Sequence, residues 1–508
     1  MATPAPGIRV RALNDAPAAT GRDYVLYWMI AARRVRWNFG LQHAAAWAED
    51  LGVPLLVLEP LRSGYRWASD RLHAFVLQGM ADNAVRLGRA GVAYYPYLEP
   101  ASGAGRGLLA ALAQHAAVVV TDDYPAFFLP RMLAAAAPQV PARFEAVDSN
   151  GLLPLRAADR TFPSAYAFRR FLQAHLQPHL SQFPEADPLG RAARPPARVP
   201  DDIARRWPPV ASAALAGVGT TLAGLPVDHA VAPSPIRGGA AEGESVLARF
   251  LDERLARYAT ERNQPDDEVA SGLSPYLHFG HVSVHEVFSA LMTRERWTTR
   301  AIAAKATGQR AGWWGASPAA EGFLDQLVTW REVGFNMCDH APNHDRYEAL
   351  PAWARQTLEA HAADPRAHVY SLEQFEHART HDPLWNAAQV QLVREGRIHN
   401  YLRMLWGKKI LEWTRHPTEA LAVMIELNNK YALDGRDPNS YSGIFWVLGR
   451  YDRPWFPERP IFGTIRYMTS ENTARKVRVG GYIARYAAAM TASSAGTTAP
   501  AAAHGTVK

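Results

Sequence analysis

The 508-residue sequence contains a single cysteine, Cys338, which excludes an internal disulfide and a zinc site built on cysteines. Its 18 histidines form no HExxH motif or comparable ligand cluster, so we expect no bound metal. No uncharged apolar run reaches the roughly 18 residues that a membrane-spanning helix needs. The first residues, MATPAPGIRVRALNDAP, lack the apolar stretch of a signal peptide. We therefore expect a cytoplasmic protein that does not associate with membranes.

Two common nucleotide-binding motifs, GxGxxG and the P-loop pattern, are also missing, so a standard dinucleotide or P-loop site is not indicated. Residues 22–155 instead alternate β-type runs such as DYVLYWMI and AVVVTDDY with helical runs such as NFGLQHAAAWAEDLG. Strands that alternate with helices are typical of a parallel sheet covered on both faces. We therefore predict an α/β domain with a parallel five-stranded sheet over residues 22–155.

The remaining sequence predicts three further parts. Residues 156–240 are rich in Pro, Ala and Arg, which fits a connecting segment with a few short helices. Residues 241–490 have almost wholly helical periodicity, which predicts an all-α domain. Residues 491–508 are of low complexity and predict a disordered tail.

The formal net charge of +7 suggests a polyanionic partner, and part of the positive charge is concentrated near the C-terminus. In that region cationic and aromatic side chains alternate: Arg453, Arg459, Arg466, Arg475, Lys476 and Arg478 with Trp455, Phe456, Phe462 and Tyr467. Such a pattern suits phosphate contacts and base stacking in a nucleic acid. A solvated basic surface would give the same pattern.

The stretch LRMLWGKKILEW places Trp406 and Trp413 seven residues apart, with Lys408 and Lys409 between them. On a helix both indoles would lie on one face, roughly 10 Å apart along the axis. Core packing explains this spacing if the stretch is considered alone.

Five motifs together point further: SGLSPYLHFG, WNAAQ, LRMLWGKKILEW, LDGRDPN and ERPIFGTIRYM. They resemble the flavin-binding domain of the class II cyclobutane pyrimidine dimer photolyases, over residues of about 245 to 480. The resemblance implies a U-shaped FAD in the helical domain and a monomeric enzyme. Photoexcited reduced flavin would pass an electron to a pyrimidine dimer flipped out of DNA. The α/β domain would be of antenna type and could hold a deazaflavin, a folate or no second chromophore.

The resemblance also implies roles for individual residues. Those matching the electron relay to the flavin are Trp385, Trp406 and Trp413, the outermost of which should lie near water. Those matching cofactor contacts are Tyr258, Ser271, Gly272, Leu273 and Ser274 around the phosphates, a buried Arg403–Asp434 pair beside the ring system, Asn428 facing flavin N5, and Asn400. Those matching lesion or DNA contacts are Trp330, Met404, Trp446, Arg453, Trp455, Arg466, Arg475 and Lys476.

Two positions depart from the family pattern. Gln326 in FLDQLVTWRE stands where the family usually has a catalytic Glu, and Asn400 in IHNYLRM stands where it usually has Gly. The first departure touches the hydrogen bond expected to the lesion. A cryptochrome-like FAD light receptor with weak or no repair activity therefore remains an alternative, as does a nucleic-acid-binding module without photochemistry.

Overall fold

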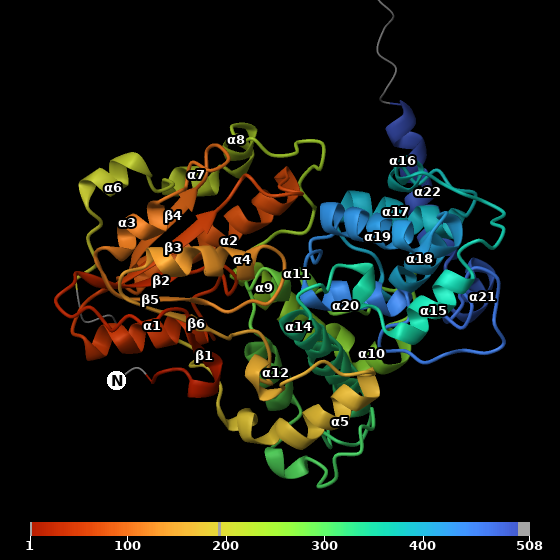
Figure 1. Cartoon of the computed structure of the whole chain (residues 1–508), viewed down its shortest axis with the longest axis horizontal. Helices are drawn as coiled ribbons and strands as arrows, with labels where there is room; N and C mark the ends of the chain where they lie inside the picture. The colour runs from red at the N-terminus through yellow and green to blue at the C-terminus, as the bar shows by residue number, and fades with distance from the viewer. Residues whose placement is uncertain (1–2, 191–194, 496–508) are drawn as a thin grey trace, which may run out of the picture.

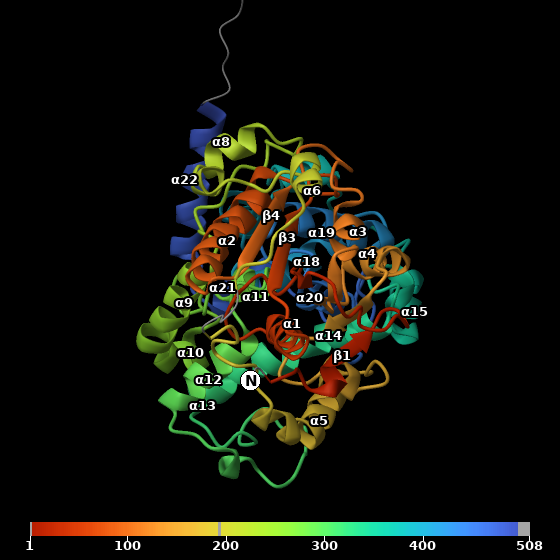
Figure 2. The same cartoon turned by 90° about the vertical axis from the view of Figure 1, so that its left-hand side faces the viewer.

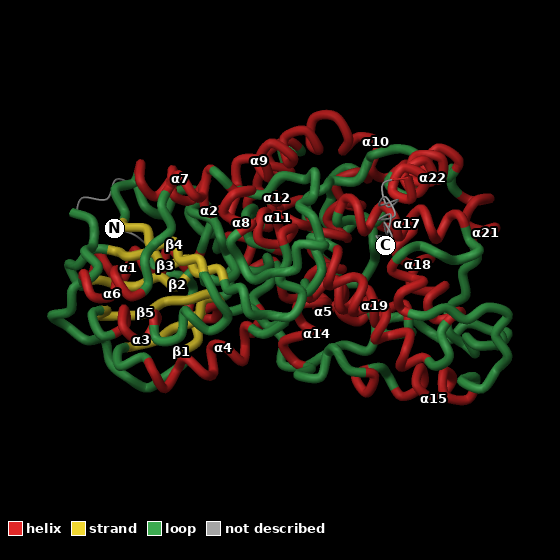
Figure 3. The backbone as a smooth tube through the Cα atoms, turned by 90° about the horizontal axis from the view of Figure 1, so that it is seen from above, coloured by secondary structure: helices red, strands yellow, loops and turns green. Residues whose placement is uncertain are grey.

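The computed structural model describes residues 3–190 and 195–495. The α/β part and the helical part lie side by side, as Figure 1 shows, and Figure 3 places all strands in one half of the molecule. None of the described helices combines the length and apolar character that a membrane crossing requires.

The sheet has six strands in the order β1-β6-β5-β2-β3-β4. Their bounds are β1 Val10–Ala12, β2 Tyr24–Trp28, β3 Leu55–Leu61, β4 Ala93–Leu98, β5 Ala116–Asp122 and β6 Arg143–Val147. Strands β2 to β6 are the five parallel strands that the sequence predicts. The prediction of a purely parallel five-stranded sheet is nevertheless wrong, because β1 pairs antiparallel with β6 at the edge. Three residues carry too short a pattern to predict a strand.

Helices cover both faces of this sheet. Successive residues of a strand point to opposite faces, so each strand packs against helices on both sides. Val25 and Tyr27 pack with α1 (Phe39–Asp50) and α2 (Asp70–Arg89). Leu26 and Trp28 pack with α3 (Leu108–Ala113) and α4 (Leu129–Ala136). Figure 2 shows β3 and β4 with α2 on one side and α3 and α4 on the other.

The segment predicted as a connection contains four short helices that pack on both parts of the molecule. They are α5 Ala165–His175, α6 Asp201–Arg206, α7 Ser212–Ala216 and α8 Val218–Ala223. α5 lies beside the helical part, where Arg169 forms an ion pair with Asp325 at 2.9 Å. α7 and α8 pack against α2.

The rest of the described chain is built from helices joined by loops. Their bounds are α9 Ala240–Arg249, the π-helical turn η5 Phe250–Arg254, α10 Leu255–Glu261, α11 Ser274–His278, α12 Val284–Arg294, α13 Pro318–Leu324, the π-helical turn η7 Asp325–Trp330, α14 Arg331–His340, α15 Ala352–Ala360, α16 Leu372–Glu376, α17 Pro383–Glu395, α18 Asn400–Trp413, α19 Pro417–Tyr431, α20 Pro438–Val447, α21 Ser470–Lys476 and α22 Gly480–Ala495. Residues 491–495, predicted as part of the tail, belong to α22. The other tail residues, 496–508, lie outside the described residues.

Side chains from the helical part hold the loop that follows β6. The carboxylate of Glu332 in α14 accepts backbone hydrogen bonds from Leu152 and Leu153 at 2.7 and 3.1 Å. Gly280 lies so close to the loop after β2 that a Cβ there would stand 1.9 Å from the carbonyl oxygen of Ala31. The two parts are therefore in direct contact, and one crevice lined by residues of both parts measures about 20 Å³.

Candidate active site

A cavity of about 600 Å³ lies inside the helical part, within the size range of small-molecule sites. It brings together residues that the sequence placed in four separate motifs. The predicted site residues that line it are Tyr258, Ser271, Gly272, Leu273, Ser274, Gln326, Trp330, Asn400, Arg403, Met404, Trp406, Asn428, Asp434, Trp446 and Arg466. Segments more than 200 residues apart therefore contribute to a single site.

One end of the cavity is formed by the turn before α11. Gly272 has φ +73°, a left-handed conformation that glycine adopts readily, and the hydroxyl of Ser271 accepts the backbone N–H of Leu273 at 3.4 Å. Tyr258 is buried nearby, with the guanidinium of Arg262 5.4 Å from its ring centroid. This end joins a tight backbone turn to a cationic side chain.

Besides Arg331 at the start of α14, five further arginines and a tyrosine line the same cavity but were not singled out from the sequence. They are Arg254, Arg262, Arg310, Arg397, Arg485 and Tyr482. Arg254 precedes Tyr258 by four residues, so helical spacing could have found it. The others come from loops and from α22, where no motif marks them. Guanidinium groups at these positions make the cavity suitable for an anionic ligand.

A charged pair stands deeper in the cavity wall. Nη2 of Arg403 in α18 lies 2.8 and 3.2 Å from the two carboxylate oxygens of Asp434. The pair is not fully buried, since the Arg403 side chain is 25% exposed to the cavity. Nε of Arg403 is buried without a hydrogen-bond acceptor among the described residues. The exposed part of the Arg403 side chain, by contrast, can contact a ligand in the cavity.

Asn428 in α19 is buried beside this pair and is only 3% exposed. Its amide nitrogen donates hydrogen bonds to the hydroxyl of Ser440 at 2.8 Å and to Oδ1 of Asn429 at 3.1 Å. Asn400 lies at the start of α18, on the exposed rim of the cavity. Both amides therefore line the cavity, one from its interior and one from its rim.

Gln326 and Trp330 both reach the cavity from the π-helical turn η7, which interrupts the continuous helical run from α13 to α14. Asp325 in this turn instead points to α5, where its carboxylate binds Arg169. Single π-helical turns inside α-helices occur often at functional sites. Met404 and Trp446, on α18 and α20, also line the cavity.

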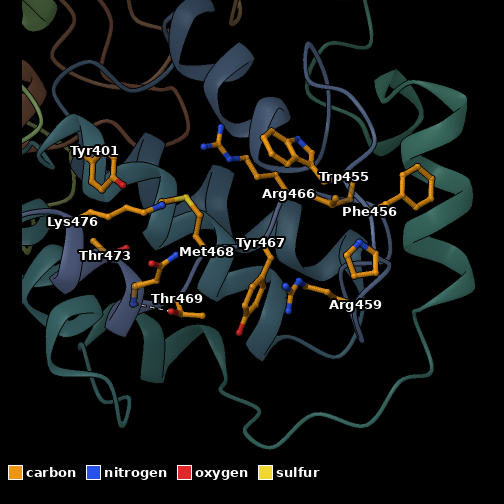
Figure 4. A pocket seen from close by; sticks show the side chains of 13 residues that line it. Tyr401, Trp455, Phe456, Arg459, Arg466, Tyr467, Met468, Thr469, Thr473 and Lys476 are labelled. Carbon is orange, nitrogen blue, oxygen red and sulfur yellow. Dashed lines mark hydrogen bonds between the residues drawn. The ribbon is translucent and has the colours of Figure 1, made fainter.

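A groove of about 280 Å³ adjoins the cavity, because Tyr401 and Arg466 line both. Figure 4 shows Arg466 and Trp455 on one side of the groove and Tyr401 and Lys476 on the other. The Arg466 guanidinium lies 4.9 Å from the ring of Trp455 and 5.8 Å from that of Trp446.

Two of the predicted DNA contacts lie outside both spaces. The Arg453 guanidinium lies 4.5 Å from the Trp455 ring centroid. Arg475 is an exposed residue of α21. The surface beside the cavity therefore joins arginines with exposed aromatic rings, Phe456 among them at 77% exposure.

The three predicted relay tryptophans form a continuous row behind the cavity. Trp406 lines the cavity and donates from Nε1 to Gln389 at 2.8 Å. Nε1 of Trp385 donates to the carbonyl oxygen of Trp406 at 3.0 Å, and the rings of Trp385 and Trp413 lie 6.0 Å apart. The indoles therefore follow one another in the order Trp406, Trp385, Trp413.

The expectation that the outermost indole lies near water is wrong, because Trp413 is only 3% exposed. The rings of Tyr370 and His381 cover it, with centroids 5.6 and 5.0 Å away. The backbone N–H of Tyr370 donates to the carbonyl oxygen of Trp413 at 3.0 Å, which fixes the covering loop to the end of α18. These two rings separate the row from the solvent.

No protein-family model matches the chain, whereas individual proteins are similar to it over most of its length. The deoxyribodipyrimidine photo-lyase of Methanothermobacter thermautotrophicus is 33% identical over 489 residues, which cover 94% of this chain and 97% of the relative. The enzyme of the same name from Oryza sativa is 36% identical over 499 residues, which cover 94% and 89%.

The fold is similar to that of a solved bacterial class III photolyase from Agrobacterium tumefaciens. The TM-score is 0.64 at 17% identity, with 93% of this chain and 88% of that one covered. This likeness supports the fold, whereas the two relatives support the family over almost the whole chain. The chain therefore belongs to the deoxyribodipyrimidine photo-lyase family.

Proposed function

We propose that the protein uses light to split cyclobutane pyrimidine dimers in DNA, by electron transfer from a reduced FAD held in the cavity. Family membership makes it a light-dependent DNA repair enzyme. One observation carries the assignment to this site: distant segments converge on one cavity that continues into a basic, aromatic groove. The motifs SGLSPYLHFG, LRMLWGKKILEW and LDGRDPN, which form much of the cavity wall, support the class II branch.

The residues of the cavity fit FAD. Arginines such as Arg254 and Arg262 suit the pyrophosphate, because guanidinium groups bind phosphate oxygens in pairs. Arg403, whose side chain is 25% exposed, lines the same cavity as the amide of Asn428. When bound and reduced, FAD supplies the light absorption and the electron that side chains cannot supply.

The charged pair and the amide have distinct tasks. Asp434 fixes the Arg403 guanidinium in one orientation and partly neutralises it, so the positive charge on this wall has a fixed position. Asn428 carries both a donor and an acceptor on one rotatable amide. It can therefore follow a change of protonation in the cavity by turning its side chain.

The apolar walls are suited to a flipped pyrimidine dimer. Trp330, Trp446 and Met404 offer rings and a thioether on which bases can stack while water is excluded. Gln326 can donate a hydrogen bond from its amide to a carbonyl of the lesion. The neighbouring groove, with Trp455 and Lys476, offers ring faces and positive charge to the flanking DNA strand.

The three indoles offer a path along which an electron can pass from the outer end of the row toward the cavity. Tryptophan is readily oxidised, and the indole of Trp385 contacts both the backbone of Trp406 and the ring of Trp413. We assign to them the relay that restores the reduced state of the cofactor. Tyr370 and His381 shield its outer end from water.

The crevice between the two parts of the molecule does not fit a second chromophore. Its volume of about 20 Å³ is enough for one water molecule but far too small for a deazaflavin or a folate. We therefore assign no second chromophore to that crevice.

Illumination of the reduced holoprotein with dimer-containing oligothymidylate tests the proposal. Absorbance near the ultraviolet base band should recover in the light and stay constant in the dark. Simultaneous replacement of Trp330 and Trp446 by Ala should abolish recovery while FAD remains bound.

A light receptor is the second candidate, and the observation that favours it is Gln326, which cannot act as a carboxylic acid. A wild-type protein that binds FAD and undergoes photoreduction but repairs no dimers would support this candidate.

A further inference from the structure

Lys408 carries a buried cationic group directly behind one wall of the cavity. Its residue exposure is 0%, and its ammonium group donates to the carbonyl oxygen of Val447 at 2.5 Å. The same nitrogen lies 5.4 Å from the ring centroid of Trp446, whose indole lines the cavity. The hydrogen-bond partner is thus a neutral carbonyl, and the nearest aromatic face belongs to a predicted lesion-binding residue.

Burial makes this charge costly. Burial lowers the pKa of Lys408 to about 7. The charge of Arg466 also lowers this pKa, whereas the charge of Asp452 raises it. An unbranched apolar side chain would fill similar space without the desolvation cost. Two local features compensate the ammonium: the negative end of the α20 dipole at Val447 and the electron-rich face of Trp446.

Trp446 is held by cations from two directions. Lys408 approaches from α18, and the Arg466 guanidinium approaches from the loop after α20, 5.8 Å from the ring centroid. Rotation of the indole away from the cavity would break its interactions with both cations. The position of this wall is therefore tied to the charge of Lys408.

We propose that Lys408 is a positioning residue for the damaged substrate: in its protonated form it fixes the Trp446 indole against the cavity and places a positive charge behind the surface on which the flipped dimer stacks. This inference rests on the proposed repair function. The electron that enters the dimer leaves it after the two cyclobutane C–C bonds between the pyrimidines have opened, so the dimer is negatively charged only transiently. A nearby buried cation stabilises that state more than the neutral ones.

The adjacent lysine provides a matched control. Lys409 also stands over an indole, 5.3 Å from the ring centroid of Trp413, and its ammonium lies 2.8 Å from Glu412. Trp413 does not line the cavity. Replacement of Lys409 by Met therefore removes the same charge from the same helix without touching the lesion wall.

The experiment compares wild type with K408M, K408Q, K408R and K409M as chemically reduced holoproteins. One measurement is the ratio of affinities for an oligonucleotide with a single thymine dimer and its undamaged counterpart at fixed salt. The other is the repair yield per absorbed photon at saturating DNA. FAD content and thermal midpoint establish that each variant is folded.

K408M should reduce the affinity ratio about fivefold, as expected when a buried cation–π interaction is removed, and should also lower the repair yield. K408Q retains a donor for the Val447 carbonyl but no charge, so it should behave like K408M, whereas K408R should restore most of both quantities. K409M should match wild type in both.

Wild-type values for folded K408M, or for folded K408Q if K408M loses FAD, would overturn the role of Lys408. An effect of K409M as large as that of K408M would do the same, since it would reveal a general effect of helix charge. A wild-type protein that neither prefers damaged DNA nor repairs it would instead refute the proposed function itself.

Discussion

The indole Nε1 of Trp385 donates a hydrogen bond to the main-chain carbonyl oxygen of Trp406, 3.0 Å away. This bond joins α17 to α18 and fixes the middle ring of the row relative to the ring that lines the cavity. The row is therefore held by the backbone of the helices as well as by ring contacts.

Replacement of Trp406, Trp385 or Trp413 by Phe should slow photoreduction of oxidised FAD by more than tenfold. Phe is harder to oxidise by far more than the roughly 1.4 kcal/mol that corresponds to a tenfold change in rate. Flavin absorbance under blue light and an external reductant measures the effect, and repair by chemically reduced protein should continue. Trp297→Phe is the control, because it loses a similar indole-to-carbonyl bond, to Trp314, outside the cavity. Unchanged rates in all three relay variants would assign these residues to packing.

Affinity for dimer-containing duplex DNA should fall steeply with salt. Replacement of Arg453, Arg466, Arg475 or Lys476 by Gln should reduce the slope of log K against log salt by about 0.9 for each phosphate interaction that the replacement removes. Arg89→Gln, an exposed change on α2, should leave the slope unchanged. The assignment of this face fails if the wild-type affinity is insensitive to salt.

Gln326→Glu should raise the repair yield per absorbed photon at unchanged affinity for the lesion. The side chain keeps its length and its place on η7 but gains a carboxyl group that can supply a proton. Loss of a correctly placed hydrogen-bond donor in other enzymes costs about 3 kcal/mol of transition-state stabilisation. The Gln326 amide replaces such a donor in part, so the gain from Gln326→Glu should correspond to less than that value. Gln326→Met, which has no donor, should repair less than wild type. Equal yields for the Gln and Glu proteins would contradict the idea.

Stability should depend on pH through Glu332. Burial raises the pKa of this carboxyl to about 7, although backbone N–H groups of Leu152 and Leu153 and the charge of Arg331 favour ionisation. The folded-state pKa exceeds the unfolded value of about 4.5. The stability that protonated Glu332 contributes is therefore fully present below pH 4.5 and is lost as pH rises through about 7. A difference of about 2.5 pKa units corresponds to roughly 3 kcal/mol.

Urea denaturation between pH 4.5 and 8 measures this effect. The unfolding free energy of wild type should fall relative to that of Glu332→Gln as pH rises. Glu253→Gln, on an exposed carboxylate, should run parallel to wild type. A constant difference in unfolding free energy between wild type and Glu332→Gln would show that the pKa of this carboxyl does not change on folding.

The sequence predicted the five parallel strands because each is a buried apolar run next to a helical pattern. It missed β1, whose three residues owe their strand conformation to pairing with β6. The motifs also predicted which residues share the cavity, since each motif occupies one helix or turn. The loop arginines Arg310 and Arg397 lack such a context.

The burial of Trp413 also could not be predicted from the sequence. The helical pattern of α18 reports which residues share a face, but not what covers that face. Tyr370 and His381 lie on either side of α16, more than 30 residues earlier in the chain, and their place over Trp413 follows from tertiary contacts. The mistaken expectation of a water-exposed indole therefore has a definite structural cause.

The short strand β1 and the arginine before it hold the edge of the sheet and the loop after β6. Arg9, just before it, is fully buried and donates to the carbonyl oxygens of Gly151 and Leu152, in the same loop that Glu332 holds. A chain shortened to start at residue 22 would leave β6 as an unpaired edge, open to association with other chains. It would also remove the hydrogen bonds that Arg9 donates to this loop. Residues 9–12 thus hold the loop after β6 and cover the edge of the sheet.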